Sequence, residues 1–427
     1  GKTTTLVQAI KALHKSEKGR ILAVTPSNTA VDLISEKLSE AGLNVVRVGN
    51  PARVSARLMS LTLDSKVSAH PANREIKKLK RQASEFRDMA HKYKRSFGKS
   101  EREQRKALFT EAQKISKEVE RTEQYIVDDL ISKADVIAAT LVGSNHYSVR
   151  SLRYHVVVID EAGQALEPAC WVPILKGRKL VLAGDHQQLP PVIKSDHQQQ
   201  DGLGFTLLEK MVERYPEAVV LLEEQYRMHS AIMHYSSKIF YKEKLMAHAS
   251  VASHLVFAGD EPLVFIDTAG CGYEEVKEGT STSNPEEAAF LLRHLNEYLL
   301  QGQSSGEIAS VAVISPYKRQ VEVLKEQLES FPALLEKGKA VSVNTIDSFQ
   351  GQERDIVYIS LTRSNQANII GFLAEVRRMN VAMTRARKKL VVIGDSATIS
   401  VHPFYNDFIA YAQSIEAYHS AWEFANL

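Results

Sequence analysis

Residues 154–164 read YHVVVIDEAGQ, and this stretch decides the fold. Four β-branched residues, Val156 to Ile159, run directly into Asp160 and Glu161. An unbroken apolar run of this length is typical of a strand buried on both faces of a parallel sheet. Ligands of such sheets bind beyond the carboxyl ends of the strands. The two acids therefore predict a site where one carboxylate holds Mg²⁺ and the other orients or deprotonates a water, unless the strand merely happens to end in acids.

The first residues of the chain resemble the end of a phosphate-binding loop. Such a loop reads G-x-x-x-x-G-K-[ST] and opens a helix, and Gly1, Lys2 and Thr3 match its last three positions, followed by Thr4 and an apolar-periodic segment. Gly-Lys-Thr is common by chance, but its place at a helix start favours the loop. Lys2 would reach the terminal phosphates of a nucleotide and the Thr3 hydroxyl would ligate Mg²⁺. We expect the loop to begin before Gly1, in a longer parent protein.

Composition bounds the class of protein. The chain has 427 residues, of which 44% are apolar and 25% charged, which is typical of a globular protein of two or three domains. Its net charge of +3 is too small to argue for a polyanionic partner by itself. Cys170 and Cys271 lie far apart, which argues against a disulfide framework or a zinc module and favours a reducing compartment. No apolar run approaches about 18 residues, so we expect no membrane span.

Apolar, β-rich runs alternate with helical patterns along the whole chain. A first series occupies residues 21–25, 45–48, 136–140, 156–159, 180–183 and 219–222, and a second occupies 263–266, 311–315, 341–345, 356–361 and 390–394. This alternation predicts an α/β fold with two mostly parallel sheets covered by helices. We expect two similar domains, residues 1–224 and 225–427.

Residues 64–131 interrupt this alternation and predict a helical insertion in the first domain. Residues 64–129 carry 17 Lys or Arg and 12 Asp or Glu, a local charge of +5 in a chain of +3. Helix-forming residues dominate and no proline follows Pro71, which favours a long helical hairpin. The hairpin is either a solvated arm without a partner or a lever that contacts nucleic-acid phosphates.

Several polar loops follow predicted strands. Residues 25–32, TPSNTAVD, and 139–145, ATLVGSN, are typical of helix caps, but such exposed hydroxyl, amide and backbone N–H groups also bind phosphate. Together the two loops suggest a track for a single strand. Gln188, in GDHQQLPP after the fifth strand, either senses a γ-phosphate or belongs to an ordinary turn.

The second half of the chain offers groups that could complete such a site. Tyr226 could stack on a nucleobase and Arg227 could neutralise phosphate, although a Tyr-Arg pair at a helix start is more often structural. Residues 345–355 form a polar, glycine-bearing loop. Arg385 is the candidate to stabilise transition-state charge, and the alternative of a solvated basic helix fits Lys388 and Lys389 better.

In this order the motifs resemble those of superfamily 1 helicases, over almost the whole chain. The motifs are GKTTT, TPSNTAVD, ATLVGSN, VVVIDEAGQ, LAGDHQQLPPV, EQYRMH, VAVISPYKRQ, TIDSFQGQERD and NVAMTRAR. The chain is most similar to the group of the immunoglobulin-mu-binding helicase and the DNA polymerase alpha-associated DNA helicase, which is related to the nonsense-mediated-decay helicase. That likeness rests on residues 248–252, 267–272 and 371–375, outside the shared motifs.

The resemblance implies two RecA-like P-loop domains that close on ATP and drive 5′ to 3′ translocation on single-stranded DNA or RNA. It implies ATP and Mg²⁺ as cofactors, a β-barrel and an adenine-reading glutamine motif before Gly1, and replication or translation and RNA-decay machinery as partners, in the nucleus or cytoplasm. Two alternatives stay open. One is a translocase that remodels nucleoproteins without separating strands, and the other is a non-catalytic nucleic-acid-binding scaffold.

Residue by residue, the resemblance assigns phosphate and Mg²⁺ binding to Lys2 and Thr3, completion of the Mg²⁺ shell to Asp160, and activation of the water to Glu161. Gln188 would sense the γ-phosphate.

From the second half of the chain, Tyr226 would stack on adenine, Arg227 and Arg385 would act as arginine fingers, and Glu353 would lie near the ribose. Nucleic-acid contacts of the family fall on Ser27, Asn28, Thr140 and Thr345.

Overall fold

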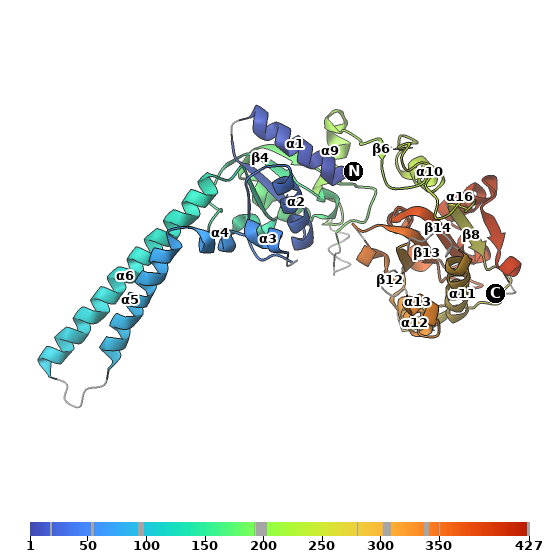
Figure 1. The fold of residues 1–427 in the computed structure, drawn as a ribbon. Coiled ribbons are helices and arrows are strands. Elements are labelled where there is room, and N and C mark those ends of the chain that lie inside the picture. The colour runs from blue at the N-terminus through green and yellow to red at the C-terminus, as the bar shows by residue number, and fades with distance from the viewer. Residues whose placement is uncertain are drawn as a thin grey trace. The chain divides into compact units, whose positions relative to one another are not determined.

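The computed structural model describes residues 1–17, 19–52, 55–92, 98–191, 193, 203–279, 281–301, 309–336, 341–349 and 351–424. Within these ranges no helix combines the length and apolar character needed to cross a membrane. The chain divides into two compact units, the first formed by residues 1–186 and 190–218 and the second by residues 187–189 and 219–427. Figure 1 labels several of their helices and strands.

The first unit is built on a parallel five-stranded sheet with the order β2-β3-β1-β4-β5. The strands are β1 (Ile21–Thr25), β2 (Val45–Arg47), β3 (Val136–Thr140), β4 (Tyr154–Ile159) and β5 (Gly177–Leu182). The predicted apolar strand is β4, where Val156 to Ile159 are buried. Because β4 lies between β1 and β5, the carboxyl end of β4 has a neighbouring strand on each side.

Helices cover both faces of this sheet. On one face, α1 (Lys2–Ser16) and α2 (Asn28–Glu40) pack Leu6, Ile10 and Ile34 against the strands. On the other face lie α7 (Glu167–Ile174), α9 (Leu207–Arg214) and the end of α6 (Lys99–Ser132), with Leu207 among the buried residues. Burial of each such aliphatic side chain contributes about 1.5–3 kcal/mol, so this core holds the polar strand ends in fixed positions.

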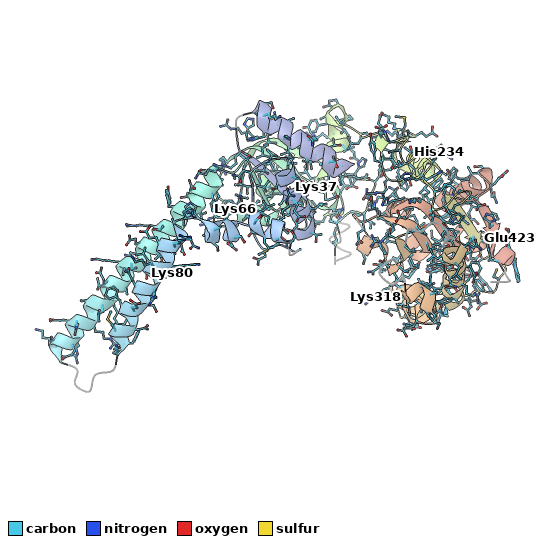
Figure 2. The ribbon with its side chains drawn as sticks, in the orientation of Figure 1. Lys37, Lys66, Lys80, His234, Lys318 and Glu423 are labelled. Atoms are coloured by element: carbon cyan, nitrogen blue, oxygen red, sulfur yellow. The ribbon has the colours of Figure 1, made fainter. Side chains whose placement is uncertain are left out.

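The insertion is helical, as expected. After α3 (Ala56–Leu61) and α4 (Leu63–Ala69), helix α5 (Asn73–His91) runs beside the 34-residue α6 (Figure 1). The seam between α5 and α6 is thin: Ile76, Val119 and Ile126 form a small apolar cluster, and Lys80 pairs with Glu123 at 2.6 Å. Exposed charged side chains line much of the hairpin (Figure 2), and a nucleic-acid contact there stays a prediction.

The second unit contains a parallel six-stranded sheet in the order β12-β11-β13-β14-β8-β15. The strands are β8 (Leu263–Asp267), β11 (Val311–Ser315), β12 (Val341–Thr345), β13 (Arg354–Ser360), β14 (Ala386–Gly394) and β15 (Tyr418–Ser420). In β8, β11, β13 and β14 the apolar side chains alternate between two clusters, one on each face of the sheet.

The helices of the second unit are α10 (Ser230–Phe240), α11 (Pro285–Gln301), α12 (Lys318–Leu328), α13 (Pro332–Glu336), α14 (Val376–Met383), α15 (Ser396–Ile399) and α16 (Pro403–Ser414). Two short two-stranded ribbons complete it, β6 (Glu224–Gln225) with β7 (Met246–Ala247) and β9 (Val276–Glu278) with β10 (Ser281–Ser283). Helices α10, α14 and α16 contribute to the first apolar cluster, while α11 and α12 contribute to the second.

Two expectations are wrong. Residues 219–222 form no strand: Val220 is 85% exposed, because no strand of the first sheet pairs with this run and hydrophobicity alone does not supply a neighbour. Lys389 does not belong to a solvated helix either. It lies in β14 and is 3% exposed, and its ammonium donates to Asp260 at 2.7 Å and to the Glu261 carbonyl at 2.7 Å.

Candidate functional site

The turn after β4 fixes the two acids. Asp160 donates its backbone N–H to the Val24 carbonyl of the neighbouring strand, and Glu161 adopts a left-handed backbone with φ 55° and ψ 37°. Gly163 follows, and a Cβ there would lie 2.6 Å from the Asp185 carbonyl oxygen, so only glycine fits. The chain therefore turns sharply at Glu161 and sends its carboxylate away from the buried strand.

Lys2 and Glu161 form an ion pair 2.8 Å long between Nζ and Oε2. The same oxygen accepts a hydrogen bond from Gln164 Nε2 at 3.0 Å. The two side chains are 27% and 26% exposed, so water reaches both. The residue that begins α1 thus contacts the residue that ends the β4 motif, and each neutralises the other. A phosphate group that attracted Lys2 would release the Glu161 carboxylate.

Asp160 is in a different environment from its neighbour. The residue is 4% exposed, and its Oδ1 accepts the Glu161 N–H at 2.9 Å. Burial raises the pKa of the Asp160 carboxyl above its ordinary value, while the nearby Lys2 charge acts in the opposite direction. The sequence predicts that one carboxylate binds a metal and the other accepts a proton. The different environments of Asp160 and Glu161 are compatible with that prediction.

The donor set suits Mg²⁺ held together with a nucleotide. Asp160 and Thr3 supply a carboxylate and a hydroxyl oxygen, which are hard ligands. Among the residues that the structure describes, no group of three or more His, Cys, Asp or Glu side chains could hold a metal ion. Protein Mg²⁺ sites commonly use one or two side chains and leave the remaining positions to phosphate and water. The two oxygens therefore fit such a shared site and not an all-protein cage.

Gln188 groups with the second unit and not with the first sheet. Residues 187–189 belong to the second unit. Asn380 Nδ2 donates to the Gln187 carbonyl at 2.9 Å, and Leu189 packs in the core of that unit. Asp185, by contrast, stays beside Gly163 in the first unit. A γ-phosphate role for Gln188 stays a prediction.

In the second unit, Arg227 is paired with an acid. Its Nε donates to Glu353 Oε2 at 2.7 Å and its Nη1 to the Thr384 carbonyl at 3.1 Å. The Arg227 and Glu353 side chains are 34% and 46% exposed. Two residues far apart in the sequence are thus brought together, and both were singled out from sequence. Arg227 also lies next to Tyr226 in the chain.

Tyr226 already has an aromatic partner. Its ring stacks on His248 with 4.3 Å between centroids and 27° between planes, and its hydroxyl donates to Glu224 at 2.7 Å. The hydrogen bond to Glu224 raises the pKa of Tyr226. With 52% of the residue exposed, one face of the ring is open to a further stacking partner.

Arg385 is buried, in contrast to Arg227. The residue is 2% exposed, and its guanidinium donates to the carbonyl oxygens of Val381 at 2.9 Å and Gln352 at 3.2 Å. Arg387, two residues later, is 42% exposed and lies 3.5 Å from Asp355. Arg385 therefore holds together the 352 loop and the end of α14, and any contact with a phosphate requires part of this arrangement to open.

The residues expected to contact nucleic acid lie at strand ends. Strands β1 and β3 are neighbours in register, Thr25 opposite Thr140, so the loops of Ser27, Asn28 and Thr140 emerge from the same sheet edge. Thr345 ends β12 in the second unit, and its hydroxyl lies 3.2 Å from that of Ser348. The first three residues are adjacent in space, whereas Thr345 belongs to the other unit.

Sequence reasoning missed two buried charged groups. Arg47 in β2 is 0% exposed and paired with Asp32, and Glu287 in α11 is 0% exposed beside Ser360 and Thr362. An arginine within the apolar stretch VVRVG could have signalled the first, because a charge inside a buried strand needs a partner. Glu287 gives no such signal, since an acid in the first turn of a helix is ordinary.

Most of the chain matches known protein families. Residues 1–196 match a protein family described as AAA domain, and residues 203–397 match a second family with the same description. The chain is 37% identical over 445 residues to the DNA-binding protein SMUBP-2 of Rattus norvegicus, with 99% of this chain and 43% of the relative covered.

Two further relatives carry helicase names. An uncharacterised ATP-dependent helicase of Methanocaldococcus jannaschii is 32% identical, with 98% of this chain and 67% of the relative covered. The DNA polymerase alpha-associated DNA helicase A of Schizosaccharomyces pombe is 34% identical, with 97% and 62% covered. The chain thus spans less than half the length of the rat relative and about two thirds of the other two.

Proposed function

This chain belongs to the superfamily 1 helicases, and from that premise we propose that it is the ATP-hydrolysing motor of a nucleic-acid helicase. One observation carries the proposal: Lys2 and Glu161, 2.8 Å apart, lie at the edge of the sheet where β4 ends in the buried Asp160. A phosphate-loop lysine, a metal-binding acid and a second acid free to exchange partners are the parts that nucleotide hydrolysis requires.

The chemistry follows from what these side chains can donate and accept. Lys2 leaves Glu161 for the more highly charged phosphates of ATP, and the released carboxylate then orients a water. It accepts a proton from that water as the water oxygen attacks the γ-phosphorus, the bond from the γ-phosphorus to the bridging oxygen breaks, and ADP leaves with that oxygen. Thr3 and Asp160 would hold Mg²⁺, which neutralises charge on the phosphate oxygens when bound. The positive charge that the transferring phosphoryl group needs would come from Arg227 and Arg385, as the family resemblance assigns them.

The ion pair between Lys2 and Glu161 would set the order of nucleotide binding and water activation in the hydrolysis cycle. While Lys2 occupies Glu161 Oε2, that oxygen already accepts two hydrogen bonds, from Lys2 and from Gln164, and is a poor base for a water. Activation of the water would therefore follow nucleotide binding instead of preceding it. Tyr226 would stack on the adenine and Glu353 would lie near the ribose, with Gln188 reporting the γ-phosphate.

Single-stranded DNA or RNA is the proposed track, entered at the loops of Ser27, Asn28 and Thr140 and at Thr345. Contacts to phosphate and stacking on bases barely distinguish DNA from RNA, so the proposal includes both as substrates. Movement 5′ to 3′, replication or translation and RNA-decay partners, and a nuclear or cytoplasmic location belong to the same proposal. They rest on the family resemblance.

The decisive experiment measures ATP hydrolysis and strand separation side by side. We expect hydrolysis by the purified protein to rise when single-stranded DNA or RNA is added, and duplexes with a 5′ overhang to separate while those with a 3′ overhang stay intact. Stimulated hydrolysis without separation of either duplex would identify a translocase. Absence of hydrolysis with nucleic acid bound would identify a scaffold and overturn the proposal.

A further inference from the structure

The Arg47 side chain, at the end of β2, is enclosed and uses three different acceptors. Its Nε donates to Asp32 Oδ1 at 3.1 Å, its Nη1 to the Val48 carbonyl at 2.8 Å, and its Nη2 to Asn28 Oδ1 at 2.9 Å. Both Arg47 and Asp32 have 0% of their side chains exposed. Asp32 Oδ2 in turn accepts the Ala52 N–H at 2.8 Å. A buried guanidinium thus ties the β2 end to the first turn of α2.

This contact fixes the direction of the Asn28 amide. A guanidinium has only donors, so the group that Asn28 turns toward Arg47 must be its oxygen. The NH2 group then lies on the other side of the amide. Because Asn28 is exposed, that side faces solvent. Without Arg47, nothing among the contacts of Asn28 in the structure would choose between the two orientations of an exposed amide, which differ little in energy.

The neighbouring candidates have the same polarity. The Ser27 hydroxyl oxygen accepts the Ala30 N–H at 3.2 Å, and the Thr140 hydroxyl oxygen accepts the Gly143 N–H at 3.0 Å. In each case one lone pair of the oxygen is engaged by the backbone, and the O–H hydrogen is available to donate outward. Because β1 and β3 are adjacent, the three residues together present donors at one sheet edge. Phosphate oxygens, which only accept, fit such an edge.

We propose that Arg47 is a positioning residue for nucleic-acid binding: it holds the Asn28 amide with its NH2 group outward, so that Asn28 donates to a phosphate oxygen of the bound strand. This inference rests on the proposed function, because it needs a single strand at the ends of β1 and β3. Arg47 itself never touches the strand. It acts by setting which end of the amide the strand meets, and it does so from a position that solvent does not reach.

The first test changes Asn28 and leaves Arg47 alone. Asn28→Asp keeps an acceptor for Arg47 and nearly the same volume but replaces the outward NH2 with a carboxylate oxygen. Asn28→Ala removes the group altogether. We expect the Kd of the purified protein for a fluorescein-labelled oligothymidylate to rise about three- to tenfold in Asn28→Ala, which corresponds to the loss of one hydrogen bond. In Asn28→Asp it should rise further, because a carboxylate repels phosphate. Equal or tighter binding by Asn28→Asp would overturn the proposal.

The second test asks whether Arg47 acts through Asn28. Arg47→Lys retains the charge, but a single ammonium cannot reach Asp32, Val48 and Asn28 together. Alone it should raise the Kd about three- to tenfold, and in the Asn28→Ala background by less than about twofold. Equal effects in both backgrounds would show that Arg47 matters only for the fold and would overturn the proposal. Arg57→Lys is the matched control, since Arg57 pairs with Glu40 at the opposite end of α2 and both are exposed.

The outcomes also separate this inference from the proposed function. If the unaltered protein binds neither oligothymidylate nor a single-stranded RNA, the proposed function fails and Arg47 loses its role with it. A different result is that the unaltered protein binds normally, while the Kd values of the two Asn28 variants fall in the wrong order or Arg47→Lys has the same effect in both backgrounds. In that case only the positioning role fails. If Arg47→Lys does not fold, shown by loss of its thermal transition, the two Asn28 variants decide. A neutral donor releases no counterions, so Asn28→Ala should leave the salt dependence of the Kd unchanged.

Discussion

The polar groups at the ends of the strands differ between the two sheets in how deeply they are buried. In the first unit, Lys2 and Glu161 are about a quarter exposed and pair with each other. In the second unit, Glu287 and Thr362, at the carboxyl end of β13, are both 0% exposed, and Arg385, at the amino end of β14, is 2% exposed. Both sheets are parallel and both carry helices on two faces, so the fold does not dictate the difference.

The difference separates groups that can change partners from groups that maintain the shape of an edge. A partly exposed ion pair contributes at most about 1 kcal/mol, so a ligand can break it at little cost. A buried polar group that loses its partner costs about 1–3 kcal/mol and therefore resists rearrangement. We infer that the first edge performs exchange chemistry and that the buried groups of the second unit mainly keep its loops in position. Arg227 is the exposed exception, and Arg385 could act on phosphate only after its present contacts open.

The largest effect should come from the first edge. Glu161→Gln keeps the size of the side chain and its contact with Gln164 but removes the base, so we expect ATP turnover to fall about 10³-fold, or about 4 kcal/mol, with nucleotide still bound. Turnover is measured by phosphate release and binding by a fluorescent ATP analogue. Glu167→Gln, which alters the ion pair between Glu167 on α7 and Lys210 on α9, is the control. Near-normal turnover in Glu161→Gln would refute the assignment of the base.

The second effect concerns Glu287. Its Oε1 accepts from Ser360 and from the Thr362 N–H, whereas its Oε2 has no partner among the described residues, and burial raises its pKa to about 7. Because the folded protein holds this proton more tightly than the unfolded chain does, the stabilisation is complete below the ordinary pKa of 4.5 and is lost as pH rises through 7. The full difference is about 3 kcal/mol.

Glu287→Gln should remove that pH dependence. We expect the difference in unfolding free energy between the variant and the unaltered protein, measured by urea denaturation, to shift by about 3 kcal/mol in favour of the variant between acidic and alkaline pH. Glu286→Gln changes the exposed neighbour in the same turn and serves as the control. The same difference at both pH values would mean that Glu287 does not hold a proton in the folded protein.

The two arginines of the second unit test the exception. Arg385→Lys should lower the unfolding free energy by about 2 kcal/mol, because a lysine cannot donate to both the Val381 and Gln352 carbonyls. Arg227→Lys, in a half-exposed pair with Glu353, should change it by less than about 0.5 kcal/mol. Thermal and urea unfolding measure both. Equal losses of stability would erase the distinction between buried and exchangeable groups.

Lys2→Met should also change stability only a little. Loss of a partly exposed pair costs under about 1 kcal/mol, but nucleotide affinity should weaken at least about tenfold because the phosphates lose their cation. Titration with a fluorescent ATP analogue gives the affinity, and Lys15→Met at the exposed end of α1 is the control. Unchanged affinity would show that Lys2 does not bind phosphate.

Much of the fold could be predicted because it depends on local pattern. Apolar runs such as Val156 to Ile159 mark buried strands wherever they occur, and their alternation with helices indicates parallel sheets. Pattern fails where pairing decides. Residues 219–222 are as apolar as a buried strand yet find no neighbour in the first sheet, and the polar β15 (Tyr418–Ser420) becomes a strand because β8 offers it an edge.

The candidate site divides in the same way. The ends of parallel strands meet at one edge, so the closeness of Lys2 to Glu161 and of Ser27 to Thr140 could be expected from their positions in the sequence. The burial of Arg385 could not, because it depends on the carbonyl groups that happen to surround it. Nor could the path of residues 187–189 into the second unit, which a single buried leucine helps to fix.

The left-handed backbone of Glu161 has a consequence for evolution in the laboratory. A residue with a Cβ in that conformation costs about 1–2 kcal/mol relative to glycine, which adopts it freely. Libraries screened for heat resistance should therefore enrich Glu161→Gly, while libraries screened for growth on the activity should eliminate it. Selection for thermal stability and selection for activity would therefore favour different residues at position 161. A thermostable enzyme would have to gain its stability at other positions.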